Sequence, residues 1–171
     1  MDERIYSGRI LSLHRERHRL PDGRQADFEI VRHPGGAGVL PVTADGELVL
    51  LRQFRPVAGG EVIEIPAGRL EAEESPRACA ERELREEAGL AAGWLKPLGW
   101  YWSSVGFCDE RIHLFVAGDL RQVGQRTESD EFIEPFRVGL DRALAMIAEG
   151  RIRDGKTMLA MLRLAQEGGV P

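Results

Sequence analysis

The sequence predicts an α/β protein in which a mixed β-sheet lies between helices. Short apolar runs of strand length, separated by turn residues, fill much of the chain up to residue 138. One long helical segment interrupts them at 76–88. Two more helices are expected at about 140–149 and 155–166, where apolar residues recur at helical spacing. Strands that alternate with helices in this way are typical of a layered α/β fold.

The first part of the chain is predicted to be a β-hairpin or meander. Segments 4–13 and 26–33 have strand composition, and the sequence Leu20-Pro21-Asp22-Gly23-Arg24 between them is a turn signal. Because His33-Pro34-Gly35-Gly36 then breaks the pattern, we expect residues 1–36 to form a separate layer ahead of a domain at 37–171.

The following strands are expected to build the central sheet. Segments 39–42 and 47–53 flank the turn Ala44-Asp45-Gly46 and are predicted to form a second hairpin. Further strands are expected at 62–65, 96–102, 112–117 and 132–138.

The helix at 76–88 carries the most informative chemistry. Ser75 is a typical N-cap, Pro76 suits the first helical position, and Gly89 suits the C-terminal end. At 3.6 residues per turn, Glu83 and Glu87 stand one above the other, and Glu86 lies on nearly the same face. One edge of the helix is therefore a cluster of carboxylates.

Such a cluster has two interpretations. Taken alone, a run of glutamates is most often an exposed acidic helix face. Here a glycine-led loop at Gly68 precedes the helix and can bring backbone carbonyl oxygen close to the carboxylates, while Arg82 can pair with one of them. Hard oxygen ligands of this kind are what Mg²⁺ or Mn²⁺ requires, which favours a metal site.

The spacing of these residues resembles the complete Nudix box. Every defining position of the motif is filled, in the order Gly68, five residues, Glu74, seven residues, Arg82-Glu83-Leu84-x-Glu86-Glu87-x-Gly89-Leu90. The resemblance implies an α/β/α sandwich with a mixed sheet. It also implies a hydrolase that uses Mg²⁺ or Mn²⁺ to cleave a nucleoside diphosphate linked to another group.

The resemblance also implies the metal ligands and the catalytic groups. The expected ligands are the carbonyl of Ala67 and the carboxylates of Glu64, Glu83, Glu86 and Glu87. For catalysis the expected residues are Glu86, Arg82 and Glu131, with Glu128 as the second choice for the loop glutamate. Residues 126–134 form an acidic stretch, which in proteins generally is more often just a solvated loop.

Substrate contacts are expected from Arg55, Arg32 and Glu110. Arg55 follows Leu51-Arg52-Gln53-Phe54 at a predicted strand end, where a guanidinium can clamp a phosphate bidentately or simply remain solvated. Glu110 ends the stretch Gly106-Phe107-Cys108-Asp109-Glu110, which resembles a loop of ADP-ribose hydrolases.

The implied substrate is ADP-ribose or a related nucleoside-diphosphate sugar. Val105 stands where ADP-ribose hydrolases usually carry a proline, so the resemblance extends to the broader group that hydrolyses nucleoside-diphosphate sugars. GDP-mannose, flavin adenine dinucleotide and dinucleoside polyphosphates remain alternative substrates. A sensor that binds nucleotide sugars without hydrolysing them is the alternative outside catalysis.

Composition limits the partners. The chain has 171 residues, 43% of them hydrophobic, and a formal net charge of -5, which argues against a large basic surface for nucleic acid. No stretch has the length and apolarity of a membrane span or a leader, and two cysteines without zinc spacing agree with a cytoplasmic location. The resemblance implies a homodimer in which the N-terminal layer crosses to the partner.

Overall fold

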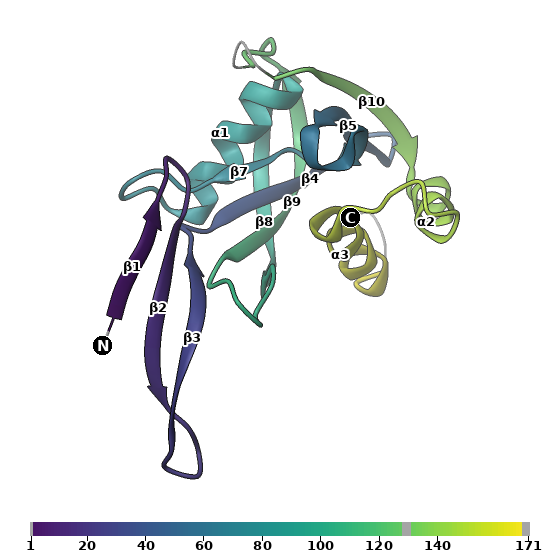
Figure 1. Cartoon of the computed structure of the whole chain (residues 1–171). Helices are drawn as coiled ribbons and strands as arrows, with labels where there is room; N and C mark the ends of the chain where they lie inside the picture. Colours follow the sequence, from purple (N-terminus) through teal and green to yellow (C-terminus); the bar gives the residue numbers. More distant parts are fainter. Residues whose placement is uncertain (1, 128–130, 169–171) are drawn as a thin grey trace.

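The structure is a computed structural model that describes residues 2–127 and 131–168. Ten strands, one short 3₁₀ helix and three α-helices follow one another in these residues (Figure 1). In chain order they are β1 (Asp2–Ser7), β2 (Ser12–Arg19), β3 (Gln25–Arg32), β4 (Gly36–Pro41), β5 (Glu47–Arg55), η1 (Pro56–Ala58), β6 (Gly60–Glu64), β7 (Ala67–Arg69), α1 (Pro76–Ala88), β8 (Leu90–Trp102), β9 (Arg111–Gln122), β10 (Ile133–Gly139), α2 (Leu140–Ala148) and α3 (Gly155–Gln166).

The strands form three sheets. The first is the N-terminal sheet β1-β2-β3, the second has the order β10-β5-β6, and the third has the order β7-β4-β9-β8. Strands β4 and β9 are parallel, whereas the other strand pairs of the third sheet are antiparallel, so this sheet is mixed. The predicted α/β class with a mixed sheet is confirmed.

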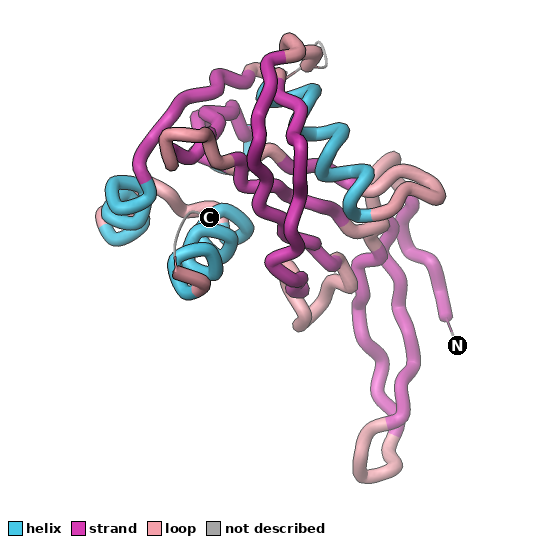
Figure 2. Tube along the Cα trace, turned by 180° about the vertical axis from the view of Figure 1, so that it is seen from behind, coloured by secondary structure: helices cyan, strands magenta, loops and turns pink. Residues whose placement is uncertain are grey.

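The helices cover opposite faces of the strands. In Figure 1, α1 lies on one side of β4, β8 and β9, and α2 and α3 lie on the other; Figure 2 shows the same layers from behind. The period-2 alternation of strand side chains supplies both cores. In β5, Val49 and Leu51 pack in the cluster beneath α1, whereas Leu48 and Leu50 pack in the cluster beneath α2 and α3. The predicted α/β/α sandwich is therefore confirmed.

The N-terminal sheet projects from this sandwich (Figures 1 and 2). The expectation of one strand at 4–13 was wrong, because the chain reverses between β1 and β2. The Gly8 amide donates to the Leu11 carbonyl at 2.9 Å and closes the turn. The dipeptide Ser7-Gly8 was the available signal for it. Three strands result instead of two.

The predicted hairpin of 39–42 with 47–53 was also wrong. Both segments are strands, but a strand has only two hydrogen-bonding edges, and in β4 both are used by β7 and β9. The edges of β5 are used by β6 and β10. The two segments meet as expected at the turn, where a bridge joins Val42 and Leu48 and the Thr43 amide donates to the Glu47 carbonyl at 2.8 Å.

The remaining predicted elements are present with shifted ends. Helices α1, α2 and α3 match their predicted ranges within one or two residues, and β8 and β9 are longer than expected. The three-residue strand β7 was not predicted, because a strand this short has no pattern of its own. No helix among the described residues is long and apolar enough to cross a lipid bilayer.

Candidate active site

A pocket of about 540 Å³ opens where β7, α1 and the end of β5 meet. Carboxylates from α1 line one part of it, and Arg55 and Lys156 line another. The full set of lining residues is Arg9, Ile10, His33, Gly36, Ala37, Gln53, Phe54, Arg55, Pro56, Ala67, Gly68, Arg69, Glu71, Arg82, Glu83, Glu87, Glu110, Ile112, Glu131 and Lys156.

Helix α1 positions the two central carboxylates. Its first turn is fixed by Ser75, whose hydroxyl accepts from the Ala78 amide at 3.2 Å, and its end is closed by Gly89 in the left-handed conformation. Glu83 and Glu87 lie on the buried face of the helix, with only 7% and 3% of their surface exposed. The common face predicted from their spacing is confirmed.

The turn into β7 lies directly against these carboxylates. The Ala67 amide donates to Oε2 of Glu87 at 2.8 Å. A Cβ added to Gly68 would overlap the Glu83 carboxylate, so glycine is the residue that leaves room for it. The glycine of the motif is therefore explained by a close approach of backbone to side chain.

The electrostatics of the pair fit a divalent cation. Burial raises the pKa of Glu87 to about 8 and raises that of Glu83, and the neighbouring charge of Glu131 adds to both shifts. The ionised forms of two buried carboxylates one helical turn apart are unfavourable unless a positive charge lies near them. Carboxylate oxygens beside the backbone of Ala67 are the hard donor set of a Mg²⁺ or Mn²⁺ site.

Arg82 holds the motif together. Its guanidinium donates to Glu74 at 2.9 and 3.0 Å, to Glu83 at 2.6 Å, to Glu86 at 3.1 Å and to the Arg69 carbonyl at 3.1 Å. It therefore ties the start of the loop and the helix into one unit. These contacts are those of a residue that positions Glu83.

The two glutamates expected to act as bases lie in different places. Glu131 lines the pocket, and its charge acts on Glu83 and Glu87. Glu86 is paired with Arg82 and lines a neighbouring groove on the outer side of α1. Glu128 lies outside the described residues.

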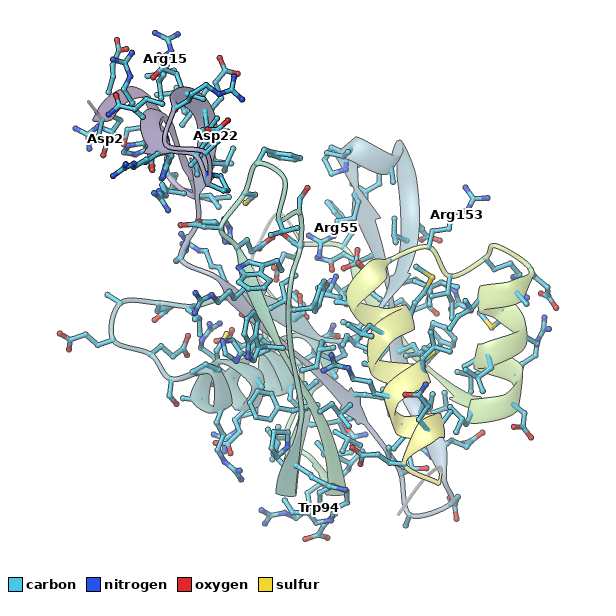
Figure 3. The ribbon with its side chains drawn as sticks, turned by 90° about the horizontal axis from the view of Figure 1, so that it is seen from below. Asp2, Arg15, Asp22, Arg55, Trp94 and Arg153 are labelled. Atoms are coloured by element: carbon cyan, nitrogen blue, oxygen red, sulfur yellow. The ribbon has the colours of Figure 1, made fainter. Side chains whose placement is uncertain are left out.

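Arg55 lines the same pocket as the carboxylates and lies beside α3 (Figure 3). Its Nε and Nη2 donate to the two oxygens of Glu64 at 2.8 and 2.9 Å, and Lys156 of α3 also donates to Glu64. Burial alone would raise the pKa of Glu64, but the hydrogen bonds and charges of Arg55 and Lys156 hold it below its usual value. Glu64 is not among the residues that line the pocket, and its partners are the two cations.

The other two expected substrate contacts separate. Glu110 lines the pocket, and its Oε1 lies 3.2 Å from Nδ1 of His33. Arg32 does not line it, because its guanidinium is held by Glu16 at 2.6 Å and by Asp109 at 3.0 Å. Arg32 thereby joins the N-terminal sheet to the segment that follows β8.

Sequence reasoning did not select Lys156, Arg9 or His33, which all line the pocket. Lys156 follows Asp154, whose carboxylate accepts from the Thr157 amide at 3.0 Å and caps α3. That cap was a detectable signal for where α3 begins, but nothing in the sequence indicated that α3 begins at the pocket. Arg9 belongs to the unpredicted turn between β1 and β2.

Comparisons with known proteins agree with this geometry. A family model described as NUDIX domain matches residues 32–161. The chain is 39% identical over 161 residues to the ADP-ribose pyrophosphatase of Bacillus subtilis (strain 168) and 40% identical over 161 residues to the methanol dehydrogenase activator of Bacillus methanolicus. Each of these alignments covers 93% of this chain and 87% of the relative. A crystal structure of an ADP compounds hydrolase superposes with a TM-score of 0.84 at 20% identity, over 99% of this chain and 95% of that one.

Proposed function

Because the chain belongs to the NUDIX domain family, we propose that it is a metal-dependent pyrophosphohydrolase of ADP-ribose or a related nucleoside-diphosphate sugar. The products would be a nucleoside monophosphate and a sugar phosphate. The observation that carries this proposal is the arrangement of Glu83 and Glu87 against the Ala67–Gly68 backbone, in a pocket that Arg55 also lines. The similarity to the ADP-ribose pyrophosphatase of Bacillus subtilis supports the choice of substrate class.

We assign the metal site to Glu83, Glu87 and the carbonyl of Ala67, with Mg²⁺ or Mn²⁺ as the cofactor. Divalent ions held by these residues would neutralise phosphate oxygens and activate a water molecule for attack. Glu86 was also expected to be a metal ligand. Because Arg82 donates to both Glu83 and Glu86, we propose that Glu86 helps to position Glu83 through Arg82 or binds a metal ion at the edge of the site. We do not assign Glu64 to the metal, because Arg55 and Lys156 occupy its oxygens.

The remaining residues would bind the substrate and accept the proton. The guanidinium of Arg55, whose orientation is fixed by its two hydrogen bonds to Glu64, would bind a phosphate bidentately. Glu131 would accept the proton of the attacking water, because it lines the same pocket as Glu83 and Glu87. Glu110 would contact the sugar hydroxyls, since carboxylates accept hydrogen bonds from them.

Phosphate release after coupling to a phosphatase tests the proposal. The panel contains ADP-ribose, ADP-glucose, GDP-mannose, UDP-glucose, flavin adenine dinucleotide and diadenosine polyphosphates, each with Mg²⁺ or Mn²⁺. We expect turnover of a nucleoside-diphosphate sugar and a requirement for the metal. Binding of these compounds without turnover would instead support the sensor.

Variants of α1 test the residues. Glu83→Gln and Glu87→Gln should each lower kcat at least about 100-fold, since displacing or neutralising one ligand misplaces the reacting groups. Glu81→Gln is the matched control, because Glu81 lies on the same helix, is exposed and pairs with Arg77. Normal turnover of both glutamine variants with added Mg²⁺ would refute the ligand assignment.

Assembly and location are part of the same proposal. We propose a homodimer in which the layer 1–36 contacts the partner, because this layer carries exposed apolar side chains, namely Ile5, Tyr6, Ile10, Leu11 and Phe28. The domain 37–171 would carry the metal site. A cytoplasmic location agrees with the two cysteines, Cys79 and Cys108, which are both free thiols.

A further inference from the structure

A second concavity lies outside the catalytic pocket. This groove, of about 740 Å³, is lined by α1, the start of β8, the end of β9 and the segment that follows β9. Four arginines line it. Arg82 is held by the glutamates of the Nudix motif, and the other three come from three different elements: Arg85 from α1, Arg121 from β9 and Arg126 from the following segment. We refer to it as the three-arginine groove.

The positive charge of the three-arginine groove is not balanced locally. The side chains of Arg85, Arg121 and Arg126 make no hydrogen bond or ion pair within the part of the chain that the structure describes. The two carboxylates in the lining are engaged elsewhere, since Glu81 pairs with Arg77 at 3.1 Å and Glu86 pairs with Arg82 at 3.1 Å. Three guanidinium groups that have no partner among residues 2–127 and 131–168 thus gather on a chain whose net charge is -5.

Backbone contacts fix the wall that carries Arg126. The Arg126 amide donates to the Glu86 carbonyl at 2.9 Å, and the Val123 amide donates to the Gly89 carbonyl at 2.8 Å. The side-chain amide of Gln125 donates to the Glu87 carbonyl at 2.7 Å. The segment is therefore held on the last turn of α1, and the position of Arg126 relative to Arg85 is set by the fold.

A simpler account explains only part of this arrangement. An arginine in the last turn of a helix is stabilised by the helix dipole, which is sufficient for Arg85. It does not explain why Arg121 and Arg126, from other elements, face the same concavity. Small residues in the lining, Ala78, Ala91 and Gly124, leave space between the guanidinium groups.

We propose that the three-arginine groove binds a compact anion that carries two or more negative charges on phosphate groups. Guanidinium groups match phosphate oxygens bidentately, and three of them around one concavity suit a multiply charged ligand better than a single carboxylate. An extended polyanion such as nucleic acid would need a longer basic surface than an acidic chain of this size offers. The proposal is independent of the hydrolytic activity.

Calorimetric titration of inorganic pyrophosphate into the full chain with EDTA tests the proposal. Without divalent cations, the carboxylates of Glu83 and Glu131 weaken binding of pyrophosphate in the catalytic pocket, and the variant Arg55→Ala reports any binding that remains there. We expect saturable binding with one site per chain, weakened by added salt. The variant R85Q/R121Q/R126Q should bind at least about tenfold more weakly.

A second variant separates the groove from net charge. R19Q/R137Q/R153Q removes the same number of charges from exposed positions outside both pockets and should bind like the wild type. If the triple variant unfolds, the single variants R85Q, R121Q and R126Q replace it, and each should weaken the binding of pyrophosphate by a smaller factor. Titration of inorganic phosphate and of AMP distinguishes a free phosphate from one carried by a nucleotide, and binding of either at the groove supports the proposal.

Three results would overturn the proposal. One is the absence of pyrophosphate binding at millimolar concentration, and another is equal weakening in both triple variants. The third is loss of binding in Arg55→Ala with unchanged binding in R85Q/R121Q/R126Q, which would move the ligand to the catalytic pocket.

Discussion

Single residues in the proposed metal site are constrained by contact between backbone and carboxylate. Gly68 lies so close to the Glu83 carboxylate that no side chain fits at this position. The neighbouring Ala67 amide donates a hydrogen bond to Glu87. The Arg82 guanidinium also fixes Glu83, through a hydrogen bond of 2.6 Å. The position of the Glu83 carboxylate therefore depends on Gly68 and Arg82, neither of which is assigned to the metal.

We expect Gly68→Ala to lower kcat about 100-fold or more, because the added methyl group displaces the Glu83 carboxylate from its place. Steady-state hydrolysis with saturating Mg²⁺ measures it. Gly60→Ala is the control, since an added Cβ there meets nothing within 4 Å. Full activity of Gly68→Ala would mean that Glu83 can move without loss.

Glu87 makes the stability of the metal-free protein dependent on pH. Its pKa is raised from 4.5 to about 8, mainly by burial, so between these values the folded state keeps a proton that the unfolded state releases. Stability therefore falls as pH rises through this window, by up to about 1.4 kcal/mol per pH unit from this group. Burial lowers the pKa of His113, which acts in the opposite sense.

We expect Glu87→Gln to stabilise the metal-free protein, and to do so more at pH 8 than at pH 6. Urea unfolding with EDTA at the two pH values measures the difference from the wild type, in which the contribution of His113 cancels. Glu81→Gln, on the exposed side of the same helix, should leave the pH dependence unchanged. An equal pH dependence in the wild type and Glu87→Gln would contradict the assignment.

Whole elements bring the two sides of the catalytic pocket together. Helix α1 supplies the carboxylates, and α3, about 70 residues later in the chain, supplies Lys156, whose ammonium pairs with Glu64 and lies 3.1 Å from Asp154. The Thr157 hydroxyl also accepts from the Ile65 amide at 2.8 Å. The C-terminal helix is thus attached to the strand that precedes the Nudix loop, next to Arg55.

We expect Lys156→Met to destabilise the protein by about 1–3 kcal/mol at neutral pH, because buried Glu64 loses one of its two cations. The pKa of Glu64 is below its usual value, so its stabilisation is present above the unfolded pKa and is lost as pH falls through the folded pKa. Urea unfolding should therefore show a difference between the wild type and the variant that shrinks in acid.

Lys96→Met is the matched control for this element. Lys96 pairs with Glu167 at 2.8 Å, but both side chains are exposed, so its removal should change stability by less than about 1 kcal/mol. Equal effects of the two substitutions would show that the Glu64 pair contributes no more than a surface ion pair.

The whole molecule has an unusual distribution of apolar surface. The sheet β1-β2-β3 projects from the sandwich, and Figure 3 views it end-on. It buries little of its apolar side-chain surface, since Tyr6 is 58% exposed and Phe28 is 42% exposed. A projecting three-stranded sheet with such side chains is typical of a surface that contacts another chain. The proposed homodimer would cover it.

We expect a dimer in sedimentation equilibrium, and we expect Tyr6→Ser/Phe28→Ser to shift it toward monomer. The change removes apolar area from the contact, at roughly 25 cal/mol per Å². Leu162→Ser is the control, because Leu162 is 47% exposed but lies on α3. A monomer at all concentrations of the wild-type protein would refute the dimer.

The sequence by itself determined helix α1, its caps and the common face of Glu83 and Glu87, because these follow from local spacing at 3.6 residues per turn. It also determined the α/β class, because apolar periodicity is local information. The tertiary structure decided which strands pair, since β4 pairs with β9 and not with β5, the strand that follows it in the sequence. It also decided that Glu64 belongs to Arg55 and Lys156, that Arg32 lies outside the pocket and that Glu86 faces the three-arginine groove. These are contacts between segments far apart in the chain, and a carboxylate looks the same in sequence whether a metal ion or a guanidinium will face it.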